Sequence, residues 1–295
     1  MKKVFVLLAF AAVASFVACD PVEIPEEDPG TSLVTVAADN LVAYLPLESA
    51  EKAVSVGEGI TLAEAKGSAS YGEGLLGQGY INTTGDNMKQ AYLKFNLASN
   101  NVFKNLESMT FTCWVKLNEA CSKGAILSVN GSGIDWPAFI AYFDNSGTND
   151  EGVKTQQVNG RLVFHDSEGA EQNLWLDTWD PNLAKYGKWF QFAFTYDSTT
   201  GAWHLLVDGV NIKDAEFGPK IPVSNFVTAS CNAMYVGGWS TFIEGQSTQD
   251  WQSYFAGSID EIRIYNRVLS ETEISTLRVQ ELAAAVAAAA SSATK

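Results

Sequence analysis

The sequence has little of what several protein classes need. Only 8 of its 295 residues are proline and 24 are glycine, which excludes collagen-like and proline-rich chains. It carries 19 basic residues against 34 acidic ones, a formal net charge of −15. This shortage of Lys and Arg argues against nucleic acid and against electrostatic binding to anionic lipid, because both need positive charge. Hydrophobic residues reach 46%, which is enough for a packed core and excludes global disorder.

Motifs for nucleophilic catalysis and for zinc are absent as well. The two histidines are His165 and His204, and no Gly-x-Ser-x-Gly segment occurs, so nothing favours Ser-His-acid hydrolysis. No CxxC or Cys/His spacing indicates zinc. Three cysteines lie beyond the leader, namely Cys113, Cys121 and Cys231, and they allow at most one disulfide. Since Cys113 and Cys231 lie in apolar segments, two buried free thiols are the alternative to a bridge.

Residues 1–18 predict a lipoprotein signal peptide. Two lysines precede the apolar run Val4–Val17, which has the length of a signal-peptide core and is too short to span a bilayer. The run stops at Ala18-Cys19. A small residue before a cysteine resembles a bacterial lipobox, in which Cys19 would be lipidated and become the mature N-terminus. An ordinary secretory signal is the alternative.

Residues 19–40 predict an extended tether, because they combine acidic residues with three of the eight prolines. An acidic stretch directly after a lipidated cysteine resembles the surface-export signal of Bacteroidetes lipoproteins. That resemblance implies a protein anchored by lipid to the outer membrane at the cell surface, with no other contact with the membrane.

Short β-type segments follow one another between residues 41 and 277. They are rich in β-branched and aromatic residues, and no helix-period window separates them, which predicts an all-β antiparallel two-sheet sandwich. Asn159-Gly160 is predicted as a two-residue hairpin turn. The main segments are Leu41–Leu45, Tyr92–Phe95, Met109–Lys116, Ala125–Val129, Phe139–Phe143, Arg161–His165, Trp189–Tyr196, Ala202–Val207, Val210–Ile212, Ala233–Val236 and Ile259–Tyr265.

A helix start is predicted near the C-terminus. Ser270 followed three residues later by Glu273 is a capping-box pattern, with Ile274 and Leu277 on one helix face. The Ala-rich residues 278–295 either extend this helix or fray.

The order of these segments resembles the laminin G-like, concanavalin A-like jelly-roll family. The resemblance implies a single jelly-roll domain over residues 41–277, in which the closing strand lies beside the opening one. It leaves the ligand open, since this fold hosts lectins, binding modules, interaction domains and glycoside hydrolases. The matching motifs are Leu41–Leu47, Tyr71–Tyr80, Met109–Val115, the pair Lys188–Tyr196 and Trp203–Gly209, Tyr235–Gly238 and Phe255–Ser270.

The same resemblance raises structural calcium as a cofactor. Asp260 in the closing strand is the position most similar to a family ligand, and the early loop offers Glu48 and Glu51 as partners. A hard-cation site takes about six oxygen ligands, which these residues do not supply. Asp260 and Glu48 are the metal candidates, and the alternative is that Asp260 accepts hydrogen bonds from loop amides.

Tryptophan carries the ligand prediction. Trp114, Trp189 and Trp203 lie inside apolar strands and are predicted to pack in the core, while the other five lie in or beside polar, loop-like segments. A sugar stacks its apolar face on an aromatic ring while its hydroxyls bind nearby Asp, Asn or Gln. A packing role, in which tryptophans anchor loops, is the alternative. The predicted carbohydrate-binding residues are Trp136, Trp179, Trp239 and Trp251.

No catalytic residue is predicted. Enzymes of this fold usually carry Glu-x-Asp-x-Glu along one strand, and no such run occurs. The nearest acidic pair, Asp260-Glu261, would point to opposite faces of a strand. The favoured function is therefore a non-catalytic glycan-binding surface lipoprotein for polysaccharide capture or utilisation, beside outer-membrane uptake proteins. The alternatives are a protein–protein interaction or adhesion module, and an O-glycosyl hydrolase with acids on loops, such as Glu168, Glu171 and Asp177.

Overall fold

The protein is described here by a computed structural model. It describes residues 36–86, 88–118, 123–131, 136–165, 171–218, 220–228 and 230–292, all within a compact unit that spans Leu33–Lys295. The predictions for the signal peptide, for Cys19, for most of the tether and for Cys121 lie outside the described residues.

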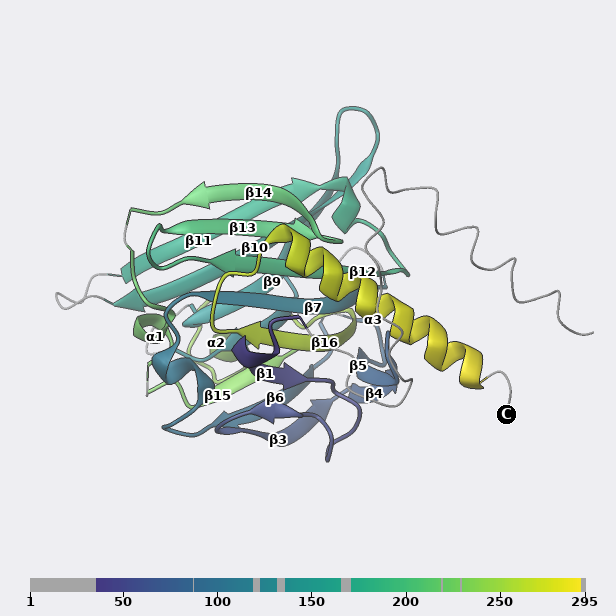
Figure 1. Cartoon of the computed structure of the whole chain (residues 1–295), viewed down its shortest axis with the longest axis horizontal. Helices are drawn as coiled ribbons and strands as arrows, with labels where there is room; N and C mark the ends of the chain where they lie inside the picture. The colour runs from purple at the N-terminus through teal and green to yellow at the C-terminus, as the bar shows by residue number, and fades with distance from the viewer. Residues whose placement is uncertain are drawn as a thin grey trace, which may run out of the picture. The chain divides into compact units, whose positions relative to one another are not determined.

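Two antiparallel sheets form the fold (Figure 1), which confirms the predicted sandwich. The nine-stranded sheet has the order β14-β13-β12-β7-β16-β1-β2, with β5 also on β16 and β4 on β5. Its strands are β1 (Leu41–Leu45), β2 (Val56–Gly57), β4 (Ala69–Glu73), β5 (Gln78–Asn82), β7 (Met109–Leu117), β12 (Trp189–Tyr196), β13 (Ala202–Val207), β14 (Val210–Glu216) and β16 (Gly257–Tyr265). The seven-stranded sheet has the order β11-β10-β9-β8-β15-β6-β3. Its strands are β3 (Ile60–Gly67), β6 (Ala91–Leu97), β8 (Ala125–Val129), β9 (Phe139–Thr148), β10 (Lys154–His165), β11 (Glu171–Asp180) and β15 (Ala233–Val236).

The helices are short except for the last one. The closing strand β16 pairs antiparallel with the opening strand β1, with Leu45 opposite Ile262, as the family resemblance implies. No helix among the described residues is long and apolar enough to cross a membrane. The helices are η1 (Ala38–Asn40), η2 (Val102–Asn105), η3 (Pro181–Leu183), α1 (Val223–Phe226), α2 (Ser240–Ile243) and α3 (Glu271–Ser292).

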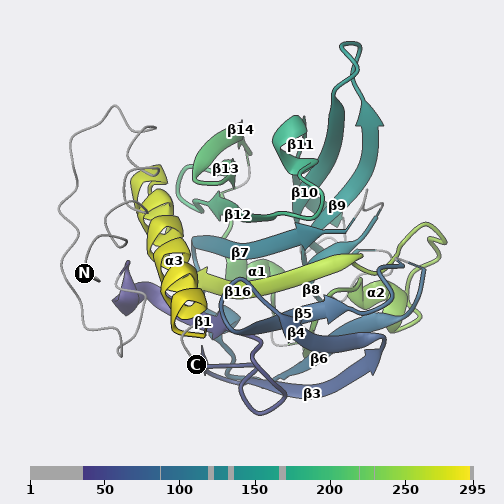
Figure 2. The same ribbon diagram turned by 90° about the vertical axis from the view of Figure 1, so that its right-hand side faces the viewer.

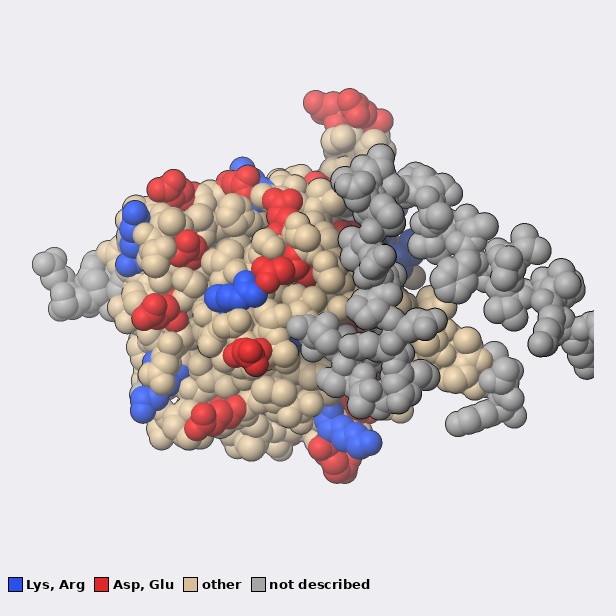
Figure 3. Space-filling model, in the orientation of Figure 1, with Lys and Arg blue, Asp and Glu red and all other residues tan. Residues whose placement is uncertain are grey.

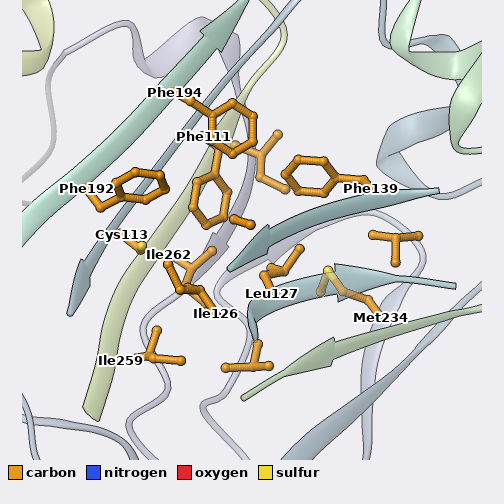
Figure 4. Packing of buried hydrophobic residues seen from close by; sticks show 14 of the residues in the cluster. Phe111, Cys113, Ile126, Leu127, Phe139, Phe192, Phe194, Met234, Ile259 and Ile262 are labelled. Carbon is orange, nitrogen blue, oxygen red and sulfur yellow. The ribbon is translucent and has the colours of Figure 1, made fainter. Parts of the chain in front are cut away.

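The core lies between the inner faces of the two sheets (Figure 4). Phe111 on β7 stacks on Phe194 of β12 with ring centroids 5.2 Å apart, and Phe139 of the opposite sheet meets both rings. Cys113 and Cys231 are free thiols within this core, so they form no bridge, and burial raises the pKa of both. Strands that alternate inward and outward residues therefore close a single aromatic-rich core.

One turn prediction is wrong. Asn159 and Gly160 lie in the middle of β10, where Gly160 pairs with Leu176 on β11 and Ala141 on β9. Pairing with a strand on each side holds Gly160 in an extended conformation, so the chain does not turn here. The predicted turn interrupts β10, so the sequence analysis also places the residues of its neighbour β11 in loops, whereas they form a strand.

Helix α3 crosses part of the outer face of the nine-stranded sheet, and α2 lies on the opposite side of the sandwich (Figure 2). The capping box is confirmed, because the Ser270 hydroxyl accepts from the Glu273 N–H and the Glu273 carboxylate accepts from the Ser270 N–H at 2.8 Å. Ile274 and Leu277 pack on the sheet. The helix then continues to Ser292, so the Ala-rich segment extends it as far as the described residues reach.

Charged side chains on the face crossed by α3 are scattered among neutral ones (Figure 3). The part of that face that Figure 3 leaves visible thus offers an anionic ligand no broad basic surface.

A buried ionic cluster attaches α3 to the sheet. Arg263 pairs with Glu261 of its own strand at 2.6 Å and with Glu281 of α3, and all three side chains are 1% exposed. Glu281 also accepts from the indole of Trp114 at 2.6 Å, and the Tyr44 hydroxyl donates to Glu261 at 3.0 Å. Two carboxylates therefore share one guanidinium away from water.

This cluster predicts that stability depends on pH through Glu281. Burial raises its pKa from the usual 4.5 to about 7, although Arg263 acts in the opposite direction. The folded state holds this proton to higher pH than the unfolded chain does, so the free energy of unfolding should fall between about pH 5 and pH 8. A shift of this size corresponds to a decline on the order of 3 kcal/mol. Urea unfolding across this range should show that Glu281→Gln loses most of the decline.

Glu273→Gln is the matched control on the same helix. Hydrogen bonds from Arg267 lower the pKa of Glu273 to about 2, so it is ionised in both states across that range. This variant should be destabilised by the same amount at every pH and keep the wild-type slope. An unchanged slope in Glu281→Gln would contradict the assignment.

Candidate functional site

The outer face of the seven-stranded sheet is covered over part of its width. The segment 239–254, which contains α2, places Trp239 against Tyr142 of β9 with ring centroids 4.6 Å apart. Further along, Tyr254 stacks on Tyr92 of β6 with ring centroids 6.3 Å apart. Strands β6, β15, β8 and β9 thus have aromatic residues packed over their outer faces.

Three of the four predicted carbohydrate-binding tryptophans meet in this cover. Ring centroids of Trp136, Trp239 and Trp251 are 5.3 to 5.8 Å apart. Trp239 has no exposed surface, and its indole donates to the Lys123 carbonyl at 2.5 Å. It is therefore a packing residue, because a fully buried ring cannot stack on a ligand.

Trp136 and Trp251 keep some exposure, but cations lie over their rings. The guanidinium of Arg161 lies 3.4 Å from the Trp136 ring centroid, and the Lys123 ammonium lies 5.0 Å from that of Trp251. Such cation–π contacts occupy a ring face that a sugar would need. The three tryptophans do come together as predicted, but protein side chains occupy the space around their rings.

Strands β10 and β11 at the end of the sheet lie beyond this cover (Figure 2). On β11, Trp175, Asp177 and Trp179 alternate with inward residues such as Leu174 and Leu176, which are buried. Trp175 is 49% exposed and Trp179 is 47% exposed. Two large indoles half in water on one strand face are unusual, since aromatic rings of this size are otherwise buried.

Neighbouring strands hold both rings in place. The Trp175 indole donates to Oδ1 of the buried Asn159 on β10 at 2.8 Å. The Trp179 ring reaches over Gly147 of β9, where a Cβ would lie 3.3 Å from it. Between them, Gln157 donates to Oδ2 of Asp177 at 2.7 Å. These side chains therefore have fixed orientations before any ligand arrives.

A β-bulge between β9 and β10 places a further polar side chain, Asp144, next to Asn159. Gln156 pairs with Ser146 while Val158 pairs with Phe143, so β9 has one extra residue opposite β10. Such a bulge changes the direction of local side chains. Asp144 lies in it and accepts from Asn159 at 3.4 Å.

Arg161 and Tyr142 set the electrostatics between the cover and the open strands. Arg161 lies between Trp136 and Trp175, is 8% exposed and donates to Asn173. Burial lowers the pKa of Arg161 and raises that of Tyr142, and neither change is large enough to alter their charges near neutral pH. The site therefore keeps a fixed protonation pattern there.

The metal candidates lie together, at the glycine-rich turn before β5. Oδ2 of Asp260 accepts from the N–H groups of Leu75 and Leu76 at 2.7 and 3.0 Å, and Oδ1 accepts from the Glu261 N–H at 2.8 Å. Oε2 of Glu48 accepts from the Gln78 N–H at 2.9 Å. Both carboxylates thus fix one turn of the backbone.

This geometry does not fit a calcium site. A cation at the oxygens of Asp260 would face N–H hydrogens, whereas calcium needs oxygen lone pairs that point toward it. Among the described residues no group of three or more His, Cys, Asp or Glu side chains is arranged to hold a metal ion. Calcium binding therefore remains a prediction, and Asp260 and Glu48 do not provide a set of ligands for it.

Comparison with protein families places the chain. Residues 87–275 match the model of the concanavalin A-like lectin/glucanases superfamily, a laminin G type. The chain belongs to this superfamily. The matched region contains all eight tryptophans of the chain, and Glu48 lies outside it. No curated protein matches the chain.

Several solved structures are similar to the chain at low sequence identity. The binding domain of botulinum neurotoxin DC, in complex with rat synaptotagmin II, is 14% identical with a TM-score of 0.53, covering 82% of this chain and 52% of its own. The chain thus spans about half the length of that domain. A carbohydrate-binding module (CBM40) of the Ruminococcus gnavus IT-sialidase, bound to α2,3-sialyllactose, is 21% identical (TM-score 0.44, covering 59% and 84%). Domain 4 of the arabinanase AbnA of Geobacillus stearothermophilus, in complex with arabinotriose, is 19% identical (TM-score 0.43, covering 81% and 98%).

The carbohydrate-binding residues predicted from the sequence include Trp179, one of the two half-exposed tryptophans of β11, and do not include the other, Trp175. The sequence does contain a pattern that could identify Trp175. Leu174 and Leu176 alternate with Trp175 and Asp177, which is the period of a half-buried strand. The polar residues around it favoured a loop instead.

We expect Asp260→Ala to lower the free energy of unfolding by about 3 kcal/mol or more, because three N–H groups lose their acceptor. Asp260→Asn, which keeps an acceptor oxygen, should lie between that variant and wild type. Glu48→Ala removes one bond at a partly exposed position and should cost about 1 kcal/mol. Urea unfolding measures all three, and a wild-type midpoint for Asp260→Ala would contradict this role.

Proposed function

We propose that the protein binds carbohydrate on the open face formed by Trp175, Asp177 and Trp179. The observation that carries this proposal is the pair of half-exposed indoles on one strand face, with a carboxylate between them. Rings of this kind stack on the apolar faces of sugars, and the carboxylate accepts hydrogen bonds from sugar hydroxyls.

The fixed orientation of these groups supports the proposal. Asn159 holds the Trp175 indole and Gln157 holds the Asp177 carboxylate, so little side-chain freedom is lost on binding. Membership in a superfamily of lectins and glucanases supports carbohydrate as the ligand class. Glycoside hydrolysis needs two carboxyl groups beside the bond that is cleaved. Asp144 is paired with Lys123 and so is not available as a second acid beside Asp177, which favours binding over cleavage.

The proposed setting is the bacterial cell surface. A lipid on Cys19 would anchor the protein to the outer membrane, with residues 19–40 as the tether, and the domain would present polysaccharide to neighbouring uptake proteins. The apolar run that ends at Ala18-Cys19 and the acidic residues after it support this setting.

Trp175→Ala and Trp179→Ala should each weaken binding to a polysaccharide by about thirtyfold, the usual loss of ~2 kcal/mol for a central aromatic contact. Thermal unfolding should change little for Trp179→Ala, because half of that ring is already in water. Affinity electrophoresis of the purified full chain in gels with different polysaccharides gives the measurement.

Trp189→Ala is the matched control, since Trp189 is a partly exposed tryptophan on β12 of the other sheet. It should keep full affinity. Binding that survives loss of both Trp175 and Trp179 would contradict the site. Release of reducing sugar would indicate a hydrolase, and protein capture without glycan binding would indicate an adhesion module.

Replacement of Cys19 with Ser should move the protein from the membrane fraction to the soluble fraction of its host, because the thiol that carries the lipid is gone. Cell fractionation followed by immunoblotting checks this. Continued partition of the variant with membranes would contradict lipidation at this residue.

A further inference from the structure

We infer that the open face takes an uncharged glycan chain and rejects chains that carry carboxylate or sulfate groups. This inference rests on the proposed function and names the substrate class at the same site. Three observations support it. They are the spacing of Trp175 and Trp179, the charge of Asp177, and the contacts that nearby cations already make within the protein.

The aromatic spacing favours a chain over a single sugar. Trp175 and Trp179 are four residues apart on β11 and on the same face, which places their Cα atoms roughly 13 Å apart. One sugar ring can cover one indole, so a ligand that contacts both indoles must extend along the strand. The strand direction therefore sets the direction of the bound chain.

Asp177 lies midway on that path. Its Oδ2 accepts from the amide of Gln157, which is neutral and leaves the negative charge in place. A sugar hydroxyl can donate to this carboxylate, whereas a uronate or sulfate group can only accept and would be repelled.

The cations that contact this face are already engaged. Arg161 is buried between two indoles, donates to Asn173 and lies 4.0 Å from the Glu171 carboxylate. Lys123 is paired with Asp144 and covers the ring of Trp251. Lys123 cannot turn toward an anionic ligand without leaving the buried carboxylate of Asp144 unpaired, which is unfavourable. Arg161 is 8% exposed and packed against the Trp136 ring, so its guanidinium presents little surface to a ligand.

The test uses the full chain and pairs of polysaccharides that share one backbone and differ in carboxymethyl substitution, with the Asp177→Asn variant separating the effect of charge from that of the added group. Neutral glucan, xylan, mannan, arabinan and galactan are each compared with their own carboxymethyl derivatives by affinity electrophoresis. Wild-type protein should bind at least one neutral polymer about tenfold more tightly than its carboxymethyl form. In Asp177→Asn, which keeps the shape of the side chain, this ratio should fall to about threefold or less.

Asp39→Asn separates the local effect from the net charge of −15. Asp39 is exposed in η1 beside the other sheet, so its loss changes the total charge equally and should leave the ratio unchanged. Oligomers of the bound polymer then test the spacing. Affinity should rise with chain length in wild type, and Trp179→Ala should lose most of that rise.

The outcomes distinguish this inference from the proposed function. Equal or tighter binding of the carboxymethyl polymers, or an unchanged ratio in Asp177→Asn, would overturn the inference while glycan binding stands. Binding that is the same for a monosaccharide and its longer oligomers would overturn the extended ligand. Binding to none of the polymers would overturn the proposed function itself.

Discussion

Both sheets of the sandwich carry large side chains on their outer faces, and what covers those faces decides where a ligand can bind. Helix α3 covers part of the nine-stranded sheet, held by the contacts of Glu281 with Arg263 and Trp114. On the other sheet, Trp239 and its neighbours cover the central strands. Strands β10 and β11 are left with aromatic and polar groups in water. The face proposed to bind carbohydrate is thus a part of the seven-stranded sheet that the segment around Trp239 does not cover.

The covered and open regions are joined by shared residues. Arg161 contacts Trp136 of the cover on one side and Trp175 of the open face on the other. Asn159 connects Trp175 to Asp144 below it. The aromatic packing that hides Trp239 therefore also fixes the groups that face solvent. Side chains that are already held rigidly lose less conformational entropy when a ligand binds. The packing of the cover therefore contributes to the proposed affinity.

Much of the fold could be predicted from local signals. Strand alternation, the Ser270–Glu273 capping box and the pairing of the first strand with the last all follow from short-range patterns or from family motifs. Other features depend on contacts between residues far apart in the sequence, which local patterns do not reveal. Asn159-Gly160 has the sequence of a turn, yet pairing with β9 on one side and β11 on the other makes Gly160 a strand residue. Helical propensity alone left the Ala-rich segment undecided, whereas the docking of Glu281 on the sheet explains why the helix continues.

Two bulges explain why acidic residues alone were a poor guide to the site. At the first, Asp260 pairs with Trp114 and Arg263 with Thr112, so two residues lie opposite one, and Glu261 takes a left-handed φ of 54°. That conformation directs Asp260 to the backbone of a turn and Glu261 to Arg263, so both acids are consumed by structure. The second bulge, at Asp144, likewise consumes its acid in a contact with Lys123. Asp177 lies on a regular strand instead, between two half-exposed indoles, and accepts a hydrogen bond only from the neutral amide of Gln157. The function proposed for this face therefore depends on which carboxylates long-range packing pairs with cations or turns, and short sequence motifs do not encode that.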